Sequence, residues 1–253
     1  MASSTRTFAG SQGYELTARL DAPAQKPRAY ALFAHCFTCS KDSKAAAYIA
    51  KALAEHGIAV LRFDFTGLGM SRGAFADTTF SSNIGDLLAA AAHLRATLEA
   101  PRLLIGHSLG GAAVLAAARE VPEARAVVTL GAPYEPKHVA RLIAGGEARI
   151  RREGRAEVDI GGRPFTVRRE FLDDLERQQP LATIGALRKA LLVMHSPRDD
   201  TVDIDNAAKI FMAAKHPKSF VSLDDADHLL TRAADAAYAA DIIAAWAPRY
   251  LAR

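Results

Sequence analysis

The sequence has little cysteine and few aromatic residues. Two of its 253 residues are cysteine, one is tryptophan, and aromatic residues make up 7%. Two cysteines are too few for a disulfide-rich secreted scaffold, so that class is excluded. Half of the residues are apolar and 24% are charged, as in ordinary globular proteins. The chain must therefore be stabilised mainly by an apolar core, which a domain of this length can bury.

Long apolar runs and a secretory leader are also missing. No run approaches the roughly 20 apolar residues that a membrane span requires. The first ten residues, MASSTRTFAG, lack the basic region and apolar core of a signal peptide. We therefore expect a cytoplasmic protein that has no membrane partner.

Cofactor motifs are absent as well. The chain contains neither a glycine-rich phosphate loop nor a dinucleotide fingerprint. Its His, Cys, Asp and Glu residues show no spacing typical of a metal site. We expect no cofactor and no metal.

Excess positive charge is confined to one segment. The chain has 32 Lys and Arg residues and 28 Asp and Glu residues, a net charge of +4. Residues 137–189 hold 12 of the basic and 8 of the acidic residues, which leaves 20 of each elsewhere. Nucleic-acid-binding proteins usually carry a broad basic face. A local surplus argues against a nucleic-acid partner.

Strand-like and helix-like segments alternate along the chain. Apolar or alternating runs predict strands at residues 14–20, 29–34, 58–63, 102–106, 126–131, 190–195 and 219–223. Helical patterns fill most of the intervals, at residues 44–56, 82–98, from near Ser108, 203–214 and 232–246. Repeated βα units predict an α/β fold, with a mainly parallel sheet covered by helices on both faces. We expect one domain over residues 1–253.

The alternation breaks between Pro133 and Lys189. The segment AEVDI-GG-RPFTV predicts a hairpin that turns at residues 161–162, and a short helix is expected at 169–177. We interpret residues 134–189 as an insertion that forms a small lid. Its Phe165 and Phe171 are candidates to line an acyl pocket, and its arginines either attract an anionic substrate or form a solvated face.

A candidate nucleophile lies between a predicted strand and a predicted helix. Residues 106–110 read Gly-His-Ser-Leu-Gly, the G-x-S-x-G pattern. Small residues on both sides allow a sharp turn that projects the Ser108 hydroxyl above the sheet. The helix start adds partial positive charge beside a forming oxyanion. The pattern therefore predicts Ser108 as a nucleophile.

The loop after the strand at 29–34 is a candidate oxyanion loop. In a sheet of this kind that loop supplies one backbone N–H, and the residue after the nucleophile supplies the other. We assign these donors to Phe37 and Leu109. His35 is interpreted as a residue that braces the loop.

The same loop contains Cys36-Phe37-Thr38-Cys39, a C-x-x-C pattern before a helix. This pattern is typical of redox motifs, because a helix terminus lowers a thiol pKa. A second hypothesis is that oxidation of Cys36, which lies beside the proposed oxyanion donor Phe37, changes the catalytic activity.

Candidates for an acid and a base follow the last two strands. Asp199 and Asp200 follow the strand at 190–195, and the spacing to Val202 favours Asp199. Glu135 is an outside candidate, since it follows the strand at 126–131. His228 precedes the final helix and is the candidate base. The chain order Ser108, Asp199, His228 is typical of serine hydrolases with this sheet.

The chain resembles the α/β-hydrolase superfamily from end to end. Besides the three residues above, Asp64-Phe-Thr-Gly-Leu-Gly-Met-Ser71 is similar to its D-x-R-G-x-G-x-S loop, with Thr66 in place of arginine. The segments AHCFTCSKD, RFDFTGLGMSRG and DDADHLL resemble a subgroup that is often fused to OsmC-like thiol peroxidase domains. The 253 residues do not include such a domain, so the resemblance leaves two alternatives: a stand-alone member of this subgroup, or one part of a chain that has an OsmC-like partner domain.

These residues predict a serine hydrolase that cleaves carboxylic esters of short to medium acyl length. A dehalogenase or epoxide hydrolase is excluded, because it needs an aspartate where Ser108 stands. An acyltransferase or thioesterase with the same triad, and a binding module that serves a thiol peroxidase, remain as alternatives. The sequence contains no coiled-coil heptad repeat, so it does not indicate an oligomeric state.

Overall fold

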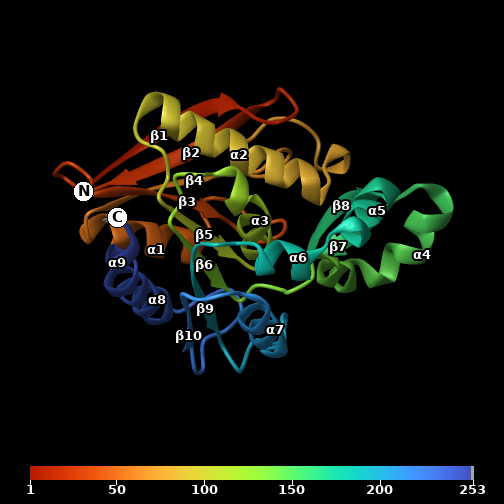
Figure 1. Ribbon diagram of the computed structural model, residues 1–253. Helices are drawn as coiled ribbons and strands as arrows, with labels where there is room; N and C mark the ends of the chain where they lie inside the picture. Colours follow the sequence, from red (N-terminus) through yellow and green to blue (C-terminus); the bar gives the residue numbers. More distant parts are fainter. Residues whose placement is uncertain (252–253) are drawn as a thin grey trace.

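The predicted strands form one large sheet. In the computed structural model, which describes residues 1–251, eight strands lie in the order β1-β2-β4-β3-β5-β6-β9-β10 (Figure 1). Their bounds are β1 Ala2–Ala9, β2 Glu15–Ala22, β3 Ala29–Ala34, β4 Ile58–Phe63, β5 Leu103–His107, β6 Ala126–Leu130, β9 Ala190–His195 and β10 Lys218–Ser222. The strands from β4 to β10 in this order pair in parallel, whereas β2 pairs antiparallel with both of its neighbours, β1 and β4. The prediction of a mainly parallel sheet is confirmed.

The central strands are buried on both faces. Every residue of β3, β4 and β9 is buried. Helices cover both faces of a parallel sheet, so its strands read as continuous apolar runs rather than as alternating patterns. This explains why short apolar segments located these strands to within a residue or two.

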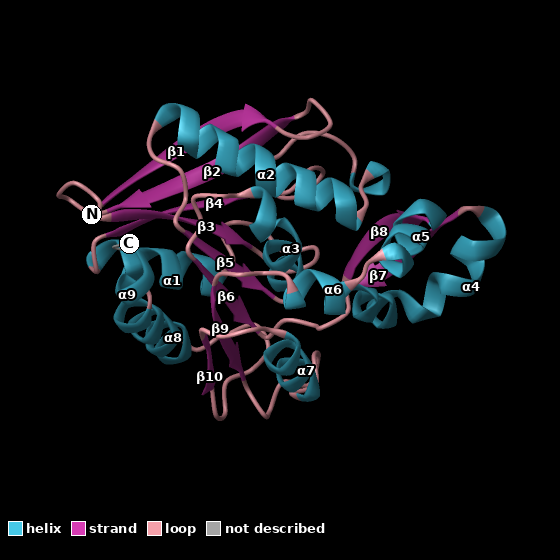
Figure 2. Cartoon of the chain, in the orientation of Figure 1, coloured by secondary structure: helices cyan, strands magenta, loops and turns pink. Residues whose placement is uncertain are grey.

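Two groups of helices cover the sheet (Figure 2). One face carries α1 (Lys44–Glu55) and α8 (Ala233–Trp246), with the short α9 (Pro248–Leu251) after it. The other face carries α2 (Phe80–Thr97), α3 (Leu109–Ala117) and α7 (Asp205–Ala213). Two short 3-10 turns, η1 (Phe75–Asp77) and η2 (Ala118–Glu120), precede α2 and follow α3. Each group encloses its own apolar cluster against the sheet.

The sequence pattern did not predict the first strand. β1 lies at the edge of the sheet, pairs only with β2 and exposes most of its side chains. A strand with one neighbour and little burial needs no regular apolar alternation. The backbone pairing, rather than side-chain burial, defines it.

Residues between β6 and β9 leave the large sheet and project to one side of it (Figure 1). This segment contains η3 Pro136–Ile143, α4 Ala144–Glu153, β7 Arg155–Ile160, β8 Arg163–Arg168, α5 Arg169–Arg177 and α6 Pro180–Gly185. β7 and β8 form a separate antiparallel hairpin that turns at residues 161–162. The helix α4 was not predicted, because two glycines in its first turn weaken the helical signal.

No helix within residues 1–251 combines the length and apolar content that crossing a membrane requires.

Candidate active site

The candidate nucleophile occupies a strained turn between β5 and α3. Ser108 has φ 54° and ψ −126°, a conformation that L-residues rarely adopt. Glycine is required beside it, because a Cβ at Gly110 would lie 2.4 Å from the carbonyl oxygens of Ala34 and His35. The G-x-S-x-G glycines therefore allow the turn to pack directly against the end of β3.

The structure brings the three residues Ser108, His228 and Asp199 together in one hydrogen-bonded chain. The Ser108 Oγ lies 3.0 Å from His228 Nε2, and His228 Nδ1 lies 2.7 Å from Asp199 Oδ2. Ser108 and His228 are each 8% exposed, and the Asp199 side chain is 2% exposed. Residues that are 120 and 29 positions apart in the chain meet at the carboxyl edge of the parallel strands.

The loop after β9 holds the Asp199 carboxylate. Its Oδ1 accepts hydrogen bonds from the backbone N–H groups of Thr201, at 3.0 Å, and Val202, at 2.8 Å. Burial by itself raises the pKa of Asp199, but the hydrogen bond and charge of His228, with the two amides, hold the pKa below its ordinary value. The carboxylate is therefore ionised at neutral pH.

The two alternative acids lie elsewhere. Asp200 is exposed and accepts a hydrogen bond from the Thr201 hydroxyl. Glu135 forms an ion pair of 3.1 Å with Lys137. Neither carboxylate contacts His228 within the described residues.

Gly131, which the sequence analysis treated only as a strand end, lies beneath the acid and base. It has φ +53°, and a Cβ there would lie 3.0 Å from Asp199 Oδ2 and 3.4 Å from His228 Nδ1. Any side chain would push the acid away from the base. The feature of the sequence that could have indicated this role is a glycine at the carboxyl end of a predicted central strand.

Two buried histidines that the sequence analysis passed over hold the site loops. His107 Nε2 donates to the carbonyl of His228, and His195 Nε2 donates to the carbonyl of Val202, each at 2.7 Å. Burial lowers the pKa of His107 to about 4 and also lowers the pKa of His195. Both are neutral donors at neutral pH. Each histidine is the last residue of a strand and directly precedes a loop of the site, and that position in the sequence could have indicated its role.

Phe37 and Leu109, which carry the candidate oxyanion donors, line the same small cavity, and Leu109 directly follows Ser108. Neither the Phe37 N–H nor the Leu109 N–H donates a hydrogen bond to any group in the part of the chain that the structure describes. Both side chains belong to the apolar cluster that joins the inserted segment to the core. An oxyanion is the kind of acceptor that two such amides can bind.

Several contacts fix the loop that carries Phe37. His35 Nδ1 donates to the Cys36 carbonyl at 2.8 Å, and Cys36 and Cys39 form a disulfide. The Phe37 ring lies between Phe75, with centroids 5.6 Å apart, and Phe171, at 5.5 Å. Phe171 is thus buried against the oxyanion loop.

Thr66 stands where the superfamily pattern has arginine, and other residues hold the loop that contains it. The buried Asp64 carboxylate accepts from the Lys41 N–H at 2.6 Å, the Lys41 Nζ at 2.9 Å and the Met70 N–H at 2.9 Å. Thr66 instead donates twice to Asp86. Lys41, only 2% exposed, places a cation against the buried Asp64 carboxylate of this loop.

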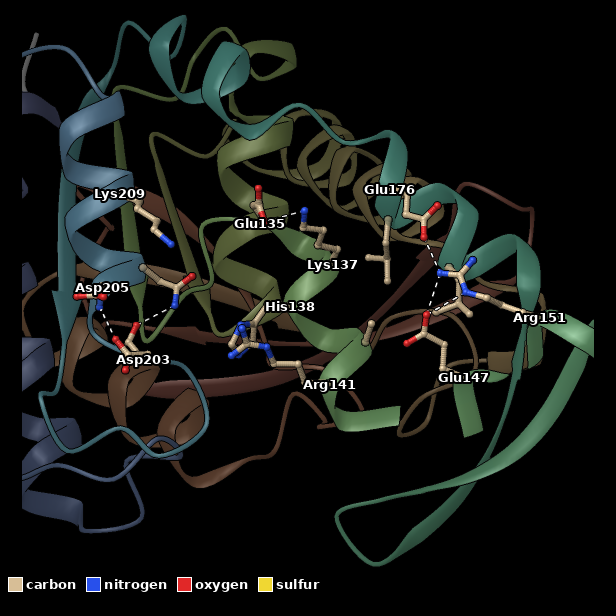
Figure 3. Close-up of a pocket in the computed structure, with 14 residues that line it drawn as sticks. Glu135, Lys137, His138, Arg141, Glu147, Arg151, Glu176, Asp203, Asp205 and Lys209 are labelled. Atoms are coloured by element: carbon tan, nitrogen blue, oxygen red, sulfur yellow. Dashed lines mark hydrogen bonds and ion pairs between the residues drawn. The ribbon is translucent and has the colours of Figure 1, made fainter. Parts of the chain in front are cut away.

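A polar cavity of about 510 Å³ lies between the inserted segment and α7 (Figure 3). Its wall contains acidic and basic side chains, and Arg151 lies between Glu147 and Glu176. None of Ser108, Asp199 and His228 lines it. The cavity is therefore separate from the candidate nucleophile, although His138 on its wall donates to the carbonyl of Thr201 in the acid loop.

No group of three or more His, Cys, Asp or Glu side chains is placed to hold a metal ion in residues 1–251.

Comparisons with known proteins place the chain in a hydrolase family. The family model described as serine aminopeptidase, S33, matches residues 25–177. The esterase domain of a Rhodothermus marinus protein is 50% identical, with a TM-score of 0.82 over 99% of this chain and 100% of that one. A comparison with curated proteins gave no match.

More distant structures share the fold. Est1E from Butyrivibrio proteoclasticus, solved with ferulic acid, is 21% identical, with a TM-score of 0.80 over 98% of this chain and 100% of that one. Mouse alpha/beta hydrolase domain-containing protein 10 is 20% identical, with a TM-score of 0.80 over 97% and 99%. The predicted α/β-hydrolase fold is confirmed, and the chain belongs to the serine aminopeptidase S33 family of α/β hydrolases.

Proposed function

We propose that this protein hydrolyses small-molecule carboxylic esters of short to medium acyl length, through a covalent intermediate on Ser108. One observation carries the proposal: Asp199, His228 and Ser108 form a hydrogen-bonded chain, and the N–H groups of Leu109, the next residue, and of Phe37 have no acceptor in the described residues. The 50% identity to an esterase domain supports an ester as the substrate.

Acylation begins when the Ser108 oxygen attacks the ester carbonyl carbon. The Ser108 proton passes to His228 Nε2, and Asp199 stabilises the imidazolium that forms. The Phe37 and Leu109 N–H groups stabilise the negative charge on the carbonyl oxygen. When the tetrahedral intermediate collapses, the carbon–oxygen bond to the alcohol breaks and His228 returns the proton to the departing oxygen.

Deacylation repeats these steps with water. His228 Nε2 takes a proton from the water as its oxygen attacks the acyl carbon, and the same two amides stabilise the second oxyanion. Collapse of this intermediate releases the carboxylic acid, and the proton returns to the Ser108 oxygen. No cofactor enters this sequence.

The surroundings of the oxyanion loop are closely packed. Phe37 and Leu109 line a cavity of only about 10 Å³, close to the volume of one water, and the rings of Phe65, Phe75 and Phe80 line it too. The apolar side of the inserted segment packs on the same two residues. We propose that residues 134–189 act as a lid, and that its close packing against the oxyanion loop limits the length of the acyl group.

A series of p-nitrophenyl esters from acetate to palmitate tests the proposal. Wild type is expected to hydrolyse the short and medium members, and Ser108→Ala to lose at least about 10³-fold in kcat. A fluorophosphonate is expected to label wild type and not the variant. Wild type without ester turnover and without labelling would contradict the serine hydrolase mechanism and favour a binding module.

A further inference from the structure

The inserted segment contacts the oxyanion loop through one polar side chain. Arg163 is the first residue of β8, directly after the turn of the inserted hairpin. Its guanidinium donates a hydrogen bond to the backbone carbonyl of Thr38. Thr38 follows the proposed donor Phe37, and its carbonyl belongs to the Thr38–Cys39 peptide, two peptide units after the one that carries the Phe37 N–H.

The backbone at Thr38 needs such support. Thr38 has φ +59°, in the left-handed region that a β-branched residue avoids. A strained conformation persists only when surrounding contacts hold it. Thr38 is 5% exposed, and Arg163 is the one donor to its carbonyl in residues 1–251. Without Arg163 this buried carbonyl lacks a hydrogen bond in the described residues, and the Thr38–Cys39 peptide loses one of the contacts that hold it beside the disulfide.

Further contacts hold the guanidinium in position. The Arg163 Cζ lies 5.3 Å from the centroid of the Phe165 ring, an arrangement typical of a cation–π contact. Phe165 packs on Phe75 with ring centroids 4.8 Å apart, and Phe75 packs on Phe37. The hairpin therefore meets the oxyanion loop with both a hydrogen bond and a connected set of aromatic rings.

We propose that Arg163 is a positioning residue for the oxyanion hole, which sets the direction of the Phe37 N–H from the inserted hairpin. The inference rests on the proposed function. It assigns the insertion a part in transition-state stabilisation, besides covering the site. Arg163 itself touches no reacting atom.

The chain offers a matched control on the same hairpin. Arg168, at the other end of β8, forms an ion pair of 2.8 Å with Asp77 in η1. Both arginines join the hairpin to the core, but only Arg163 reaches the oxyanion loop. If Arg163 only held the hairpin down, Arg163→Gln and Arg168→Gln would have similar effects.

The experiment compares Arg163→Gln, Arg163→Lys and Arg168→Gln on p-nitrophenyl acetate, after wild type and Ser108→Ala have established serine-dependent turnover. Displacement of a catalytic group by about 1 Å can cost about 10²-fold. We expect Arg163→Gln to lower kcat about 10- to 100-fold with KM unchanged within about twofold, because only oxyanion binding weakens. Arg163→Lys is expected to recover part of kcat, and Arg168→Gln to stay within about twofold of wild type.

Inhibition by a trifluoromethyl ketone, which forms an oxyanion on the serine, supplies a second readout. Arg163→Gln should weaken this inhibitor by the same factor as kcat, since both report the oxyanion hole. Equal kcat and equal inhibition for the two glutamine variants, with wild type active, would overturn the role of Arg163 and leave the esterase proposal standing. Wild type without turnover or fluorophosphonate labelling would overturn both.

Discussion

The Nε2–H of His107 donates a hydrogen bond of 2.7 Å to the backbone carbonyl of His228, across 121 positions of the chain. The residue directly before the proposed nucleophile therefore holds the loop that carries the proposed base. His107 is 2% exposed, and burial lowers its pKa to about 4. At neutral pH the imidazole is uncharged and donates from one nitrogen only.

This contact predicts a pH dependence of stability. The unfolded chain binds a proton at the ordinary histidine pKa of about 6.5, whereas folded His107 binds it only near pH 4. Between these values the unfolded state holds more protons, so the free energy of unfolding rises with pH. The contribution of neutral His107 to the free energy of unfolding is fully present above about pH 6.5, and about 3 kcal/mol of it is lost as the pH falls to 4.

Urea unfolding between pH 4 and 7 measures this dependence. Over this pH range the free energy of unfolding of His107→Gln should change by about 3 kcal/mol less than that of wild type. His35 and His195, whose pKa values burial also lowers, keep part of the dependence in the variant. The same pH dependence in both proteins would show that His107 does not titrate in this way.

The identity of the acid is tested by two neighbouring substitutions. Asp199→Asn keeps the shape of the side chain but removes the charge and favours the wrong His228 tautomer, so kcat should fall about 10⁴-fold. Asp200→Asn should leave kcat within about twofold, because Asp200 is exposed and contacts only Thr201. Steady-state kinetics on one p-nitrophenyl ester is sufficient. A larger loss in Asp200→Asn would reverse the assignment.

Lys41 is expected to be important for stability. Its ammonium lies 2.9 Å from the Asp64 carboxylate, and the Asp64 side chain is fully buried. Lys41→Met leaves that carboxylate without its cation, and we expect the free energy of unfolding to fall by about 3–5 kcal/mol.

Arg95→Met is the control for Lys41→Met. Arg95 pairs with Glu123 at 2.7 Å, but both side chains are substantially exposed, so the expected loss is at most about 1 kcal/mol. Urea unfolding at pH 7 compares the two variants. Equal losses would mean that Lys41 contributes no more than a surface ion pair.

Reduction of the Cys36–Cys39 disulfide is expected to lower turnover. A dithiol such as dithiothreitol transfers two electrons and two protons, which converts the disulfide to two thiols and the reductant to its own disulfide. The loop that carries Phe37 then loses a covalent restraint, and we expect kcat to fall about tenfold at constant KM.

The double variant Cys36→Ala/Cys39→Ala should show the lower kcat and no response to dithiothreitol. Thiol titration must show two free thiols in the treated wild type. An unchanged kcat in that sample would mean that the disulfide does not restrain the oxyanion loop.

Local sequence patterns located most of the core elements. The strand at 29–34 and the helix at 169–177 have the bounds that were predicted, because burial on both faces or on one face leaves a clear apolar pattern. The pattern did not indicate β1 or α4, since neither depends on a regular apolar face. The pattern also indicated no role for Gly131 or His107 and no contact of Arg163 with the oxyanion loop, because each acts through a contact with a distant part of the chain.

The sequence by itself determined the parallel sheet, the strained serine turn and the chain order of Ser108, Asp199 and His228. These features depend on local properties: apolar periodicity, glycines around a turn and the loops that follow strands. Only the tertiary structure decided that Asp199 rather than Asp200 meets His228, and that the inserted hairpin reaches Thr38. The physical reason is that such contacts depend on side-chain direction and on packing between elements far apart in the chain, which no local pattern encodes.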